Sequence, residues 1–441
     1  MHPYSDIPEL SSSGPNVSVV RVPVEQDIPF TRRVRAIVDT SEFQRLRQIT
    51  QLALASRAYP GAIHTRFEHA LGVYDNSLKY LAQLGKDERF AAAVSAHDAE
   101  VLIVAALLHD IGHWPFCHPI EDLELENMPP HEAFAAQFLG PDNELADVLR
   151  NQWNVQPHEV LQVLTGKSED PSLKLRQSIL SGPIDIDKMD YLNRDSQHCG
   201  VPYGRNFDRN RLISSLIPNE IGDGLAITHK GKTAAEMMVF ARYVMFSEVY
   251  WHHTVRSATT MFARAFYDVH RNLDLACLFR MTEPEMIRTL VEASLGIPAE
   301  SLTAGLFGPK RRLHKRLSEY SLFQHPELYR ALRQMPYRDI VKCSNELARV
   351  LSQRCGSNIS PVDVLIDAPP LHREVEFKVD IFYPKENTYR ALQQASPIVA
   401  AMSDNTFDDC VKRVRVCVAE HTLPLIPDSA TVDTLLGKIV M

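Results

Sequence analysis

The sequence predicts a mainly α-helical protein with a small α/β lobe at its C-terminal end. Two observations predict this fold class. Apolar residues recur at helical spacing through most of residues 38–350. From about Ser357 onward, segments that alternate apolar and polar residues or are rich in β-branched residues replace that pattern, which is typical of strands. We therefore expect an N-terminal lead-in over residues 1–30, a helical core over 31–345 and an α/β lobe over 346–441.

Composition limits the class of protein. The chain has 441 residues, of which 45% are hydrophobic, and this is enough for one or two domains with buried cores. A formal net charge of −8 gives no reason to expect nucleic acid or an anionic membrane as a partner. The seven cysteines include no CxxC pair, and the first residues lack the apolar run of a signal peptide. We expect a cytoplasmic protein with reduced thiols and no membrane span.

The helical pattern divides into successive elements. A first helix is expected in "DTSEFQRLRQITQLALA", where apolar residues repeat at near-helical spacing and Asp39 with Glu42 has the spacing of a capping box. A second helix is expected in "RFEHALGVYDNSLKYLAQL". A third, in "DAEVLIVAALLHDIG", is apolar on all sides and therefore belongs at the centre of the core.

Further helices and the strands follow in order. Helices are expected in "HEAFAAQFL", "GPIDIDKMDYLNRDSQH", "AAEMMVFARYVMFSEVYWHHTVRSATTMFARAFYDVH" and "PEMIRTLVEASL". Strands are expected in "SPVDVLIDAPP" and "REVEFKVDIFYP", and "TFDDCVKRVRVCVAEH" is expected to be a helix that runs into a strand. Near the N-terminus, "SSSGPN" (Ser11–Asn16) is expected to be a mobile lead-in.

Histidines and carboxylates gather directly after the apolar helix, in "ALLHDIGHWPFCHPIEDLE". Imidazole nitrogens and carboxylate oxygens are ligands for hard or borderline divalent metals. His109 and Asp110 are neighbours, and neighbours on a helix point about 100° apart, but at a helix end both can turn toward one ion. Further donors are His69 in "HTRFEHALG" and Asp187 in "DIDKMDYLNRD".

Each of these signals has a simpler explanation when it is taken alone. A His-Asp dipeptide is common, and a single histidine is more often a hydrogen-bonded core residue than a ligand. The four carboxylates from Asp185 to Asp195 could form a solvated helix face. The order His69, then His109 with Asp110, then Asp187 in a helical chain is more specific than any of its parts.

This ordered motif set resembles the HD-domain superfamily of metal-dependent phosphohydrolases, through "RFEH", "LLHDIGHWPFCH" and "IDIDKMDYLNRD". The flanking segments "DTSEFQRLRQITQL", "YPGAIHTRFEHALGVY" and "PPHEAFAAQFL" are similar to the deoxynucleoside triphosphate (dNTP) triphosphohydrolases, of the type that joins a SAM domain to the HD domain, here without the SAM domain. The likeness is dense from Asp39 to Val201 and weaker beyond. It implies that residues 31–345 form an HD-domain catalytic core.

The resemblance implies an activity and a metal. The chain would cleave a dNTP to a deoxynucleoside and inorganic triphosphate, with His69, His109, Asp110 and Asp187 as the metal ligands. A metal there would polarise the phosphoryl group and lower the pKa of the attacking water. The donor set suits Fe, Mn, Zn, Ni or Co, and Mg could join through the triphosphate.

The remaining histidines have expected roles in catalysis. The departing 5′-oxygen needs a proton, which imidazole supplies near neutral pH, and the resemblance gives this role to His118. Glu121, three residues on, would orient the imidazole, although the family usually has Asp at that place. The resemblance implies that His113 and His131 face the phosphates. His131 could instead be an N-cap-like residue at the start of its helix.

The resemblance also implies residues that bind the substrate, namely Gln51, Leu52, Arg66, Lys188, Tyr191, Asp195 and Arg256. Arg66 can bind phosphate oxygens bidentately, and Lys188 and Tyr191 would contact phosphates as well. Asp195, with Gln51 and Leu52, would hold the sugar in a pocket too crowded for a 2′-hydroxyl. Arg256 is a further candidate phosphate ligand, and a helix-surface arginine is the alternative.

The resemblance also implies two further kinds of partner. One is a nucleotide effector, and the other is further copies of the same chain in a dimer or a tetramer. Asp39, Gln44 and Arg47 match the family's guanine-reading segment. In "SVVRVPVEQDI", however, Val22 stands where the family has Asp, and Ser18 stands where it has a basic residue. Asp39 could simply cap a helix.

A basic cluster in "PKRRLHKRLSEY" runs from Lys310 to Arg316. A solvated helix face is the usual explanation, and an effector phosphate site or weak contact with a single strand of nucleic acid is the alternative. Few aromatic residues are interleaved for stacking on bases, so nucleic acid is not indicated.

Two other functions stay open. The chain could be an HD phosphohydrolase that acts on another nucleotide, such as a monophosphate, because the same ligands serve both reactions. It could also be a nucleotide- or nucleic-acid-binding regulator with little turnover. The complete ligand set argues against the regulator.

Overall fold

The computed structural model describes residues 2–11, 18–126, 128, 130–371, 378–402 and 406–440. It is mainly helical with three small sheets, which confirms the predicted fold class. Most of the predicted lead-in segment, residues 12–16, lies outside the described residues. Among the residues that the structure describes, no helix combines the length and apolar composition that crossing a bilayer requires.

The apolar helix predicted at the centre of the core is α5 (Ala96–Leu108). Ser95 and Asp98 form a capping box at its start, and every residue from Val101 to Leu108 is buried. The neighbouring helix α3 (Arg66–Leu84) packs against α5 on one side and against α11 (Ile186–Cys199) on another. The central position of α5 is thereby confirmed, and His109, its C-cap residue, is where the chain leaves the core.

The single helix expected from Asp39 onward is wrong. The helix α1 (Arg32–Val38) ends before this segment, which contains α2 (Ser41–Gln44) and two 3-10 turns, Arg45–Gln48 and Ala53–Arg57. The cap is Thr40, whose hydroxyl accepts a hydrogen bond from the Phe43 amide, while Asp39 ends α1. The predicted capping box of Asp39 and Glu42 is therefore also wrong, because Asp39 already belongs to the end of the preceding helix.

The long helix expected over residues 234–270 is interrupted. It consists of α13 (Lys232–Met245), a π turn over Phe246–Tyr250 and α14 (His253–Val269). The second helix starts anew because the His252 imidazole accepts a hydrogen bond from the Thr254 amide as its N-cap. The break turns Tyr250 and Arg256 toward one cavity, described below.

The described residues form three sheets. A hairpin is formed by β1 (Val19–Val22) and β2 (Gln26–Pro29). A four-stranded sheet has the order β3 (Leu216–Pro218), β4 (Leu225–Thr228), β7 (Asp380–Tyr383) and β8 (Thr388–Ala391). A three-stranded antiparallel sheet has the order β5 (Lys315–Tyr320), β9 (Val414–Val418) and β6 (Val364–Asp367).

The strand predictions have mixed outcomes. The strand in "SPVDVLIDAPP" and the helix-to-strand unit in "TFDDCVKRVRVCVAEH" are confirmed as β6 and as α22 (Thr406–Val411) with β9. The strand in "REVEFKVDIFYP" is described only from residue 378, and its first part lies outside the described residues. The helix face expected for the basic cluster is wrong, because Lys315 and Arg316 lie in β5, which pairs with β9.

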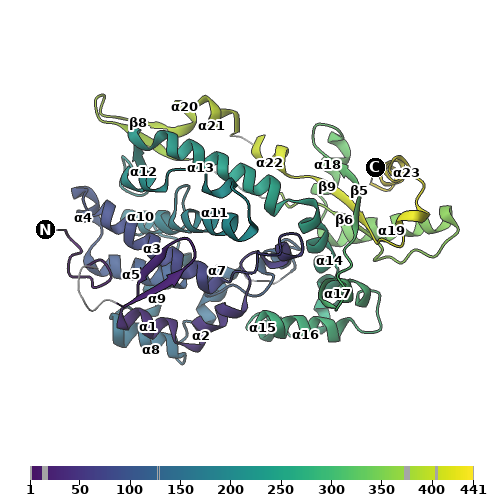
Figure 1. The fold of residues 1–441 in the computed structure, drawn as a ribbon, viewed down its shortest axis with the longest axis horizontal. Helices are drawn as coiled ribbons and strands as arrows, with labels where there is room; N and C mark the ends of the chain where they lie inside the picture. Colours follow the sequence, from purple (N-terminus) through teal and green to yellow (C-terminus); the bar gives the residue numbers. More distant parts are fainter. Residues whose placement is uncertain are drawn as a thin grey trace.

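The described residues form two large hydrophobic cores and one small cluster of Ala55, Ala62 and Val255. The second large core packs α18 (Pro326–Arg333), α19 (Tyr337–Cys355) and α23 (Ser429–Val440) around the β5–β9–β6 sheet, and Figure 1 shows this group at the end of the molecule opposite the N-terminus. Val379, Ile381 and Leu392 join the first core instead. The chain from residue 346 onward therefore contributes to both cores, and the division at residues 345 and 346 stays a prediction.

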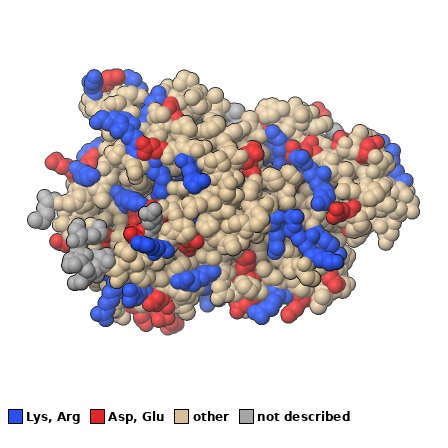
Figure 2. Space-filling view, in the orientation of Figure 1, with Lys and Arg blue, Asp and Glu red and all other residues tan. Residues whose placement is uncertain are grey.

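The other helices connect these parts. They are α4 (Glu88–Ala93), α6 (Cys117–Glu121), α7 (His131–Phe134), α8 (Glu144–Val148), α9 (Pro157–Thr165), α10 (Pro171–Leu180), α12 (Arg209–Ser214), α15 (Leu275–Leu278), α16 (Glu283–Ser294), α17 (Glu300–Phe307), α20 (Leu392–Ala395) and α21 (Pro397–Met402). On the face drawn in Figure 2, basic and acidic side chains are interspersed over most of the surface.

Candidate active site

Three donor side chains converge where α3, α5 and α11 meet. His69 lies in the first turn of α3, His109 caps the end of α5, and Asp187 lies in the first turn of α11. One ligand atom from each lies within 4.8 Å of the others. The Nε2 atom of His69 is 3.1 Å from Nε2 of His109 and 3.1 Å from Oδ1 of Asp187. Two imidazole nitrogens that face each other beside a carboxylate suit a shared cation.

Asp110 lies at the edge of this cluster. Its Oδ1 is 3.4 Å from Nε2 of His109, and its Oδ2 is 3.9 Å from Nε2 of His69. Burial alone would raise the pKa of Asp110, but the Arg66 guanidinium and the nearby imidazoles hold that pKa well below its usual range. The carboxylate is therefore ionised and can complete a donor set of two histidines and two aspartates. The structure brings His69, His109 and Asp187 together and places Asp110 beside the two histidines.

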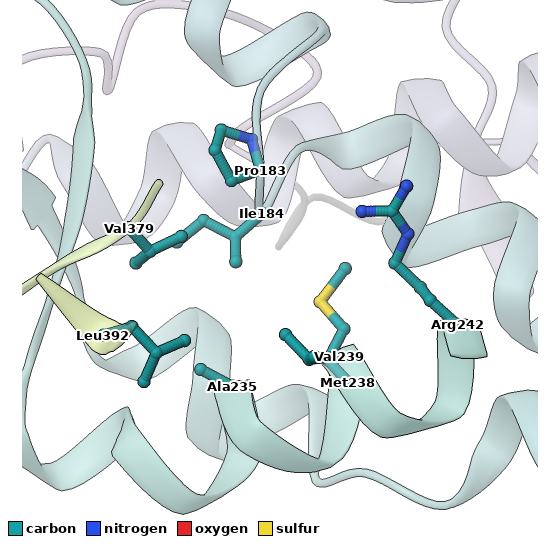
Figure 3. A pocket seen from close by; sticks show the side chains of 8 residues that line it. All are labelled: Pro183, Ile184, Ala235, Met238, Val239, Arg242, Val379 and Leu392. Carbon is teal, nitrogen blue, oxygen red and sulfur yellow. The ribbon is translucent and has the colours of Figure 1, made fainter. Parts of the chain in front are cut away.

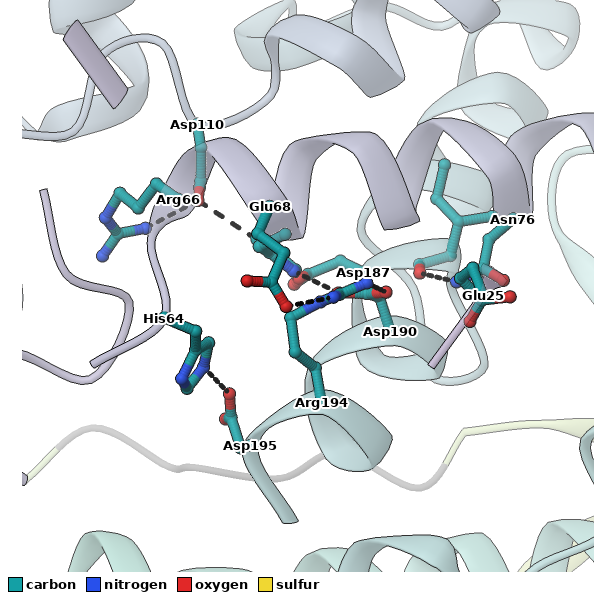
Figure 4. A network of polar contacts seen from close by, with 12 residues as sticks. Glu25, His64, Arg66, Glu68, Asn76, Asp110, Asp187, Asp190, Arg194 and Asp195 are labelled. Atoms are coloured by element: carbon teal, nitrogen blue, oxygen red, sulfur yellow. Dashed lines mark hydrogen bonds and ion pairs between the residues drawn. The ribbon is translucent and has the colours of Figure 1, made fainter. Parts of the chain in front are cut away.

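The outer nitrogens of the two histidines are occupied, and Figure 4 shows Asp190 beside Arg194 in this network. His69 donates from Nδ1 to Oδ2 of Asp190 at 2.7 Å, and His109 donates from Nδ1 to the carbonyl of Ala106 at 2.9 Å. Asp190 is held in turn by Nε and Nη2 of Arg194, each at 2.7 Å. Such outer contacts fix the tautomer of a metal-binding histidine and leave Nε2 for the ion.

The electrostatics favour a cation between the donors. Burial would lower the pKa of His69, but the carboxylates of Asp187 and Asp190 outweigh burial and raise that pKa to about 10. Negative charge thus exceeds positive charge around Nε2 of His69. A divalent metal ion fits both this charge and the chemistry of the donors, because imidazole and carboxylate suit the same borderline metals.

Asparagine in place of Asp190 is expected to weaken metal binding by about 10- to 100-fold, because it removes the charged acceptor that orients His69. Arg194 keeps Glu68 as a second partner at 2.7 Å, so the variant is expected to fold. Metal content after dialysis against graded chelator concentrations measures the effect.

The matched control for this test is Asp75→Asn. Asp75 is a buried carboxylate on α3, and it pairs with Lys79 rather than with the donor histidines. The control is expected to retain metal as the unaltered protein does. Equal metal retention in both variants would contradict the role assigned to Asp190.

A second group of histidines follows on the loop after α5 and on α6 and α7. Glu121 connects them: its Oε1 is 2.8 Å from Nδ1 of His131, and its Oε2 is 3.4 Å from Nδ1 of His118. The ring of His113 lies 3.9 Å from that of His131, centroid to centroid. With Cys117, these three histidines offer a second set of donor atoms within 4.8 Å of one another.

The three histidines differ in exposure and charge. The His118 side chain is 63% exposed and that of His131 is 15% exposed. Burial, together with the Arg66 guanidinium, lowers the pKa of His113 well below its usual range, so this imidazole is neutral. Burial would raise the pKa of Glu121, but its bonds with His118 and His131 hold that pKa well below its usual range. Glu121 is therefore an ionised acceptor for both imidazoles.

His131 is not an N-cap residue, so that alternative is wrong. Pro130 occupies the N-cap of α7, and His131 is the first residue inside the helix. The backbone amide of His131 donates to Oε1 of Glu121 at 3.0 Å, and the ring contacts the same carboxylate. The side chain is thereby directed at the histidine group.

A cavity of about 540 Å³ opens beside this group. Eight of the predicted site residues line it: Gln51, Leu52, Arg66, His118, Glu121, Tyr191, Asp195 and Arg256. Ala53, Phe116 and Glu124 also line it, and each has a left-handed backbone with φ of 46°, 56° and 47°. Non-glycine residues in this conformation are strained, and such strain tends to gather at functional sites.

One wall of the cavity holds Asp195 between two partners. Its Oδ1 is 2.8 Å from Nε2 of His64, and its Oδ2 accepts a hydrogen bond from the Tyr250 hydroxyl at 2.7 Å. Gln51 lies on the same cavity, and its buried Oε1 has no hydrogen-bond partner among the described residues. A buried polar atom without a partner indicates a place where a ligand or water completes the site.

Arg66 links the cavity to the metal donors. Its Nη1 donates to Oδ2 of Asp110 at 2.7 Å, and its buried Nε has no hydrogen-bond partner within the described ranges. Arg256 lines the cavity from α14, and its side chain is only 12% exposed. The alternative that Arg256 is a helix-surface arginine is therefore wrong.

Lys188 and the three predicted effector residues do not occur among the described residues that line this cavity. Lys188 donates from Nζ to Oδ2 of Asp185, the N-cap of α11, at 2.6 Å. Gln44 accepts a hydrogen bond from Nε of Arg47 at 2.8 Å, and Asp39 is exposed at the end of α1. Their roles in binding stay predictions.

A smaller cavity lies between α13 and the β7–β8 hairpin, as Figure 3 shows. Its volume of about 10 Å³ suffices for a single water at most. Apart from Arg242 its lining is apolar, with Pro183, Ile184, Ala235, Met238, Val239, Val379 and Leu392. It is a packing gap that is too small for a substrate.

Comparison with known families agrees with this geometry. Residues 66–195 match the family described as HD domain, and residues 207–420 match the HD-associated region. The first match starts at Arg66 and ends at Asp195, so it contains all four candidate metal ligands. The chain thus carries a segment that matches the HD domain, followed by a segment that matches its associated region.

Similar proteins come from distant organisms. An uncharacterized protein of Methanocaldococcus jannaschii is 34% identical over 311 residues, which are 70% of this chain and 61% of that protein. An uncharacterized protein of Bacillus subtilis is 35% identical over 234 residues, 52% of this chain and 51% of that one. The deoxynucleoside triphosphate triphosphohydrolase SAMHD1 of Homo sapiens is 28% identical over 280 residues, 57% of this chain and 44% of that protein. The chain thus spans about half the length of these curated relatives.

Two solved structures share the fold. A hypothetical protein from Aquifex aeolicus aligns with a TM-score of 0.69 at 24% identity, covering 95% of this chain and 100% of that one. A phosphohydrolase from Bacteroides thetaiotaomicron aligns with a TM-score of 0.67 at 25% identity, covering 92% of this chain and 100% of that one.

Proposed function

We propose that this protein is a metal-dependent hydrolase that cleaves dNTPs to a deoxynucleoside and inorganic triphosphate. The observation that carries the proposal is the arrangement of one cavity. Arg66 and His118 line one wall of this cavity, and Arg66 also contacts the metal donor Asp110. Gln51 and Asp195 form a separate wall of the same cavity. A molecule with an anionic end and a hydroxylated end suits such a cavity. The likeness to relatives named as dNTP triphosphohydrolases supports the same substrate class.

The metal ion would be held by His69, His109, Asp110 and Asp187. When bound there, a divalent metal supplies polarisation of the phosphoryl group and a lowered pKa for the attacking water. Arg66 and Arg256 would hold phosphate oxygens, since each presents a guanidinium to the cavity. Lys188 and Tyr191 stay candidates for the same role, and His113 and His131 would border the phosphates.

The reaction needs one proton at the leaving group. The oxygen of water forms a bond to the α-phosphorus as the bond from that phosphorus to the 5′-oxygen breaks, and the water releases its protons to the solvent. The proposed donor is His118, whose Nδ1 faces Glu121 and whose ring is open to the cavity. The protonated imidazole gives its proton to the 5′-oxygen, which leaves as the deoxynucleoside hydroxyl, and the other product is inorganic triphosphate.

The wall around Asp195 would bind the sugar. Asp195 already accepts from Tyr250 and contacts His64, so its carboxylate is fixed in place and can accept from a 3′-hydroxyl. Gln51 offers its unpaired Oε1 to the same region. Because Leu52 and Tyr250 border this wall, a ribose 2′-hydroxyl is expected to be poorly accommodated.

Identification of the products tests the proposal. The purified protein is incubated with each dNTP and the matching ribonucleotides, with Mn²⁺ or Mg²⁺, with and without a guanine nucleotide, in water enriched in the heavy oxygen isotope. We expect deoxynucleoside and triphosphate from the dNTPs, with solvent oxygen in the triphosphate and none in the deoxynucleoside.

Other outcomes would redirect the assignment. Mono- or diphosphate products would indicate an HD phosphohydrolase with different chemistry. Intact nucleotides under every condition would leave a regulator that binds nucleotides with little turnover. Solvent oxygen in the deoxynucleoside would contradict attack at the α-phosphorus.

A further inference from the structure

The three-stranded sheet near the C-terminus carries a row of alternating charges that reaches the cavity. Arg415 on β9 lies directly opposite Asp367 on β6 and opposite Glu319 on β5. Directly opposed residues of neighbouring strands project from the same face of a sheet. Arg415 donates from Nε to Oε2 of Glu319 at 2.8 Å, and its Nη1 is 3.6 Å from Oδ2 of Asp367.

Asp367 ends this row beside Arg256, which lines the cavity. Arg256 on α14 donates from Nη2 to Oδ1 of Asp367 at 2.6 Å and from Nε to Oδ2 at 3.2 Å. The two side chains are 12% and 2% exposed, so water screens the pair little. Two parallel hydrogen bonds fix the plane of a guanidinium as well as its place.

Trp251 is held by the same sheet. Arg415 donates from Nη2 to the carbonyl of Trp251 at 3.1 Å, and the Arg256 guanidinium lies 4.3 Å from the centre of the Trp251 ring. Trp251 and Arg256 both line the cavity. Arg256 is therefore constrained from two directions, by the carboxylate of Asp367 and by the face of an indole.

We propose that Asp367 is a positioning residue, which orients Arg256 toward the phosphates of the substrate and thereby makes the C-terminal sheet a part of the substrate site. This inference rests on the proposed function. Asp367 does not line the cavity and acts through Arg256. A long arginine side chain loses much rotational freedom when it binds an anion, and an arginine that is already held loses less.

Binding of inorganic triphosphate, measured by titration calorimetry, tests this proposal without any turnover. The proteins compared are the unaltered chain, Asp367→Asn, Arg256→Lys and the double variant. We expect Asp367→Asn to bind triphosphate about tenfold more weakly. The double variant is expected to bind no more weakly than Arg256→Lys alone, because Asp367 acts through that arginine.

The matched control is Asp363→Asn. Asp363 is a buried carboxylate just before β6, and its side chain faces His421, at 3.3 Å, rather than a residue that lines the large cavity. Its replacement is expected to leave triphosphate binding unchanged. Thermal unfolding of all five proteins shows whether any variant is misfolded. If Asp367→Asn has a lower Tm but binds triphosphate as the unaltered protein does, Asp367 only stabilises the fold.

Three outcomes would overturn the proposal. The Asp367→Asn variant could bind triphosphate as tightly as the unaltered protein or more tightly, or the effects of the two substitutions could add in the double variant. The third such outcome is that none of the proteins binds triphosphate. The proposed function fails separately, if the unaltered protein releases no triphosphate from dNTPs. Triphosphate binding that depends on Asp367, in a protein that hydrolyses no dNTP, would keep the positioning role and reject the substrate.

Discussion

Alanine in place of His109 is expected to remove metal binding at the donor cluster and to lower kcat/KM for dNTP hydrolysis by about a thousandfold or more. A bound divalent metal contributes several kcal/mol to the stabilisation of charge in such a reaction, and each 1.36 kcal/mol is a factor of ten in rate. His109 provides one of the two imidazole nitrogens that face each other at 3.1 Å, so its loss leaves the cluster with one imidazole.

Metal analysis of the purified variant and steady-state kinetics with added Mn²⁺ measure this effect. The matched control is His97→Ala, which removes a histidine from the other end of the same helix, where it is 2.8 Å from Glu159 and far from the donors. The control is expected to keep its metal and activity. A His109→Ala protein that retains both would mean that the metal lies elsewhere, for which the group of His113, Cys117, His118 and His131 is the next candidate.

Glutamine in place of His118 is expected to lower kcat for dNTP hydrolysis by about 10²- to 10⁴-fold with little change in KM, since general acid catalysis typically contributes that much. The expected effect is on kcat because the proton is needed as the bond to the 5′-oxygen breaks. Metal content should stay normal, because His118 is not among the donors around His69.

A substrate with sulfur in place of the 5′-oxygen separates proton donation from other roles of His118. A thiolate leaves without a proton, so the His118→Gln variant is expected to cleave this analogue nearly as fast as the unaltered protein does. Replacement of His158, a histidine of α9 outside the cavity, is the control and should change neither rate. Equal impairment of His118→Gln on both substrates would exclude His118 as the acid.

Much of this arrangement can be predicted from the order of residues along the chain. The run from Val101 to Leu108 is apolar on every side, so it has to be buried, and a chain that leaves the core at His109 places polar donors at the edge of that core. The helix periodicity of α3 and α11 fixes where His69 and Asp187 lie on their own helices. The metal donors were predictable because local pattern and motif order both point to them.

The partners of these donors could not be predicted in the same way. In the sequence, Asp190 is one of four carboxylates from Asp185 to Asp195, although its spacing of four from Arg194 on α11 is a usable signal. No sequence pattern marked His64, which meets Asp195 across 131 positions, or Asp367, which meets Arg256 across 111 positions. Such contacts arise from packing between distant segments, and local propensity carries no information about them.

The sequence by itself determined the fold class, the identity of the metal donors as candidates and the chemical character of the histidine-rich loop, because these follow from residue type and spacing. Only the tertiary structure decided that Glu121 serves both His118 and His131, that Arg256 is buried against Asp367, and that Lys188 faces Asp185. The physical reason is that a side chain with several bonding choices takes the partner that packing brings within about 3 Å, and packing is a property of the whole chain.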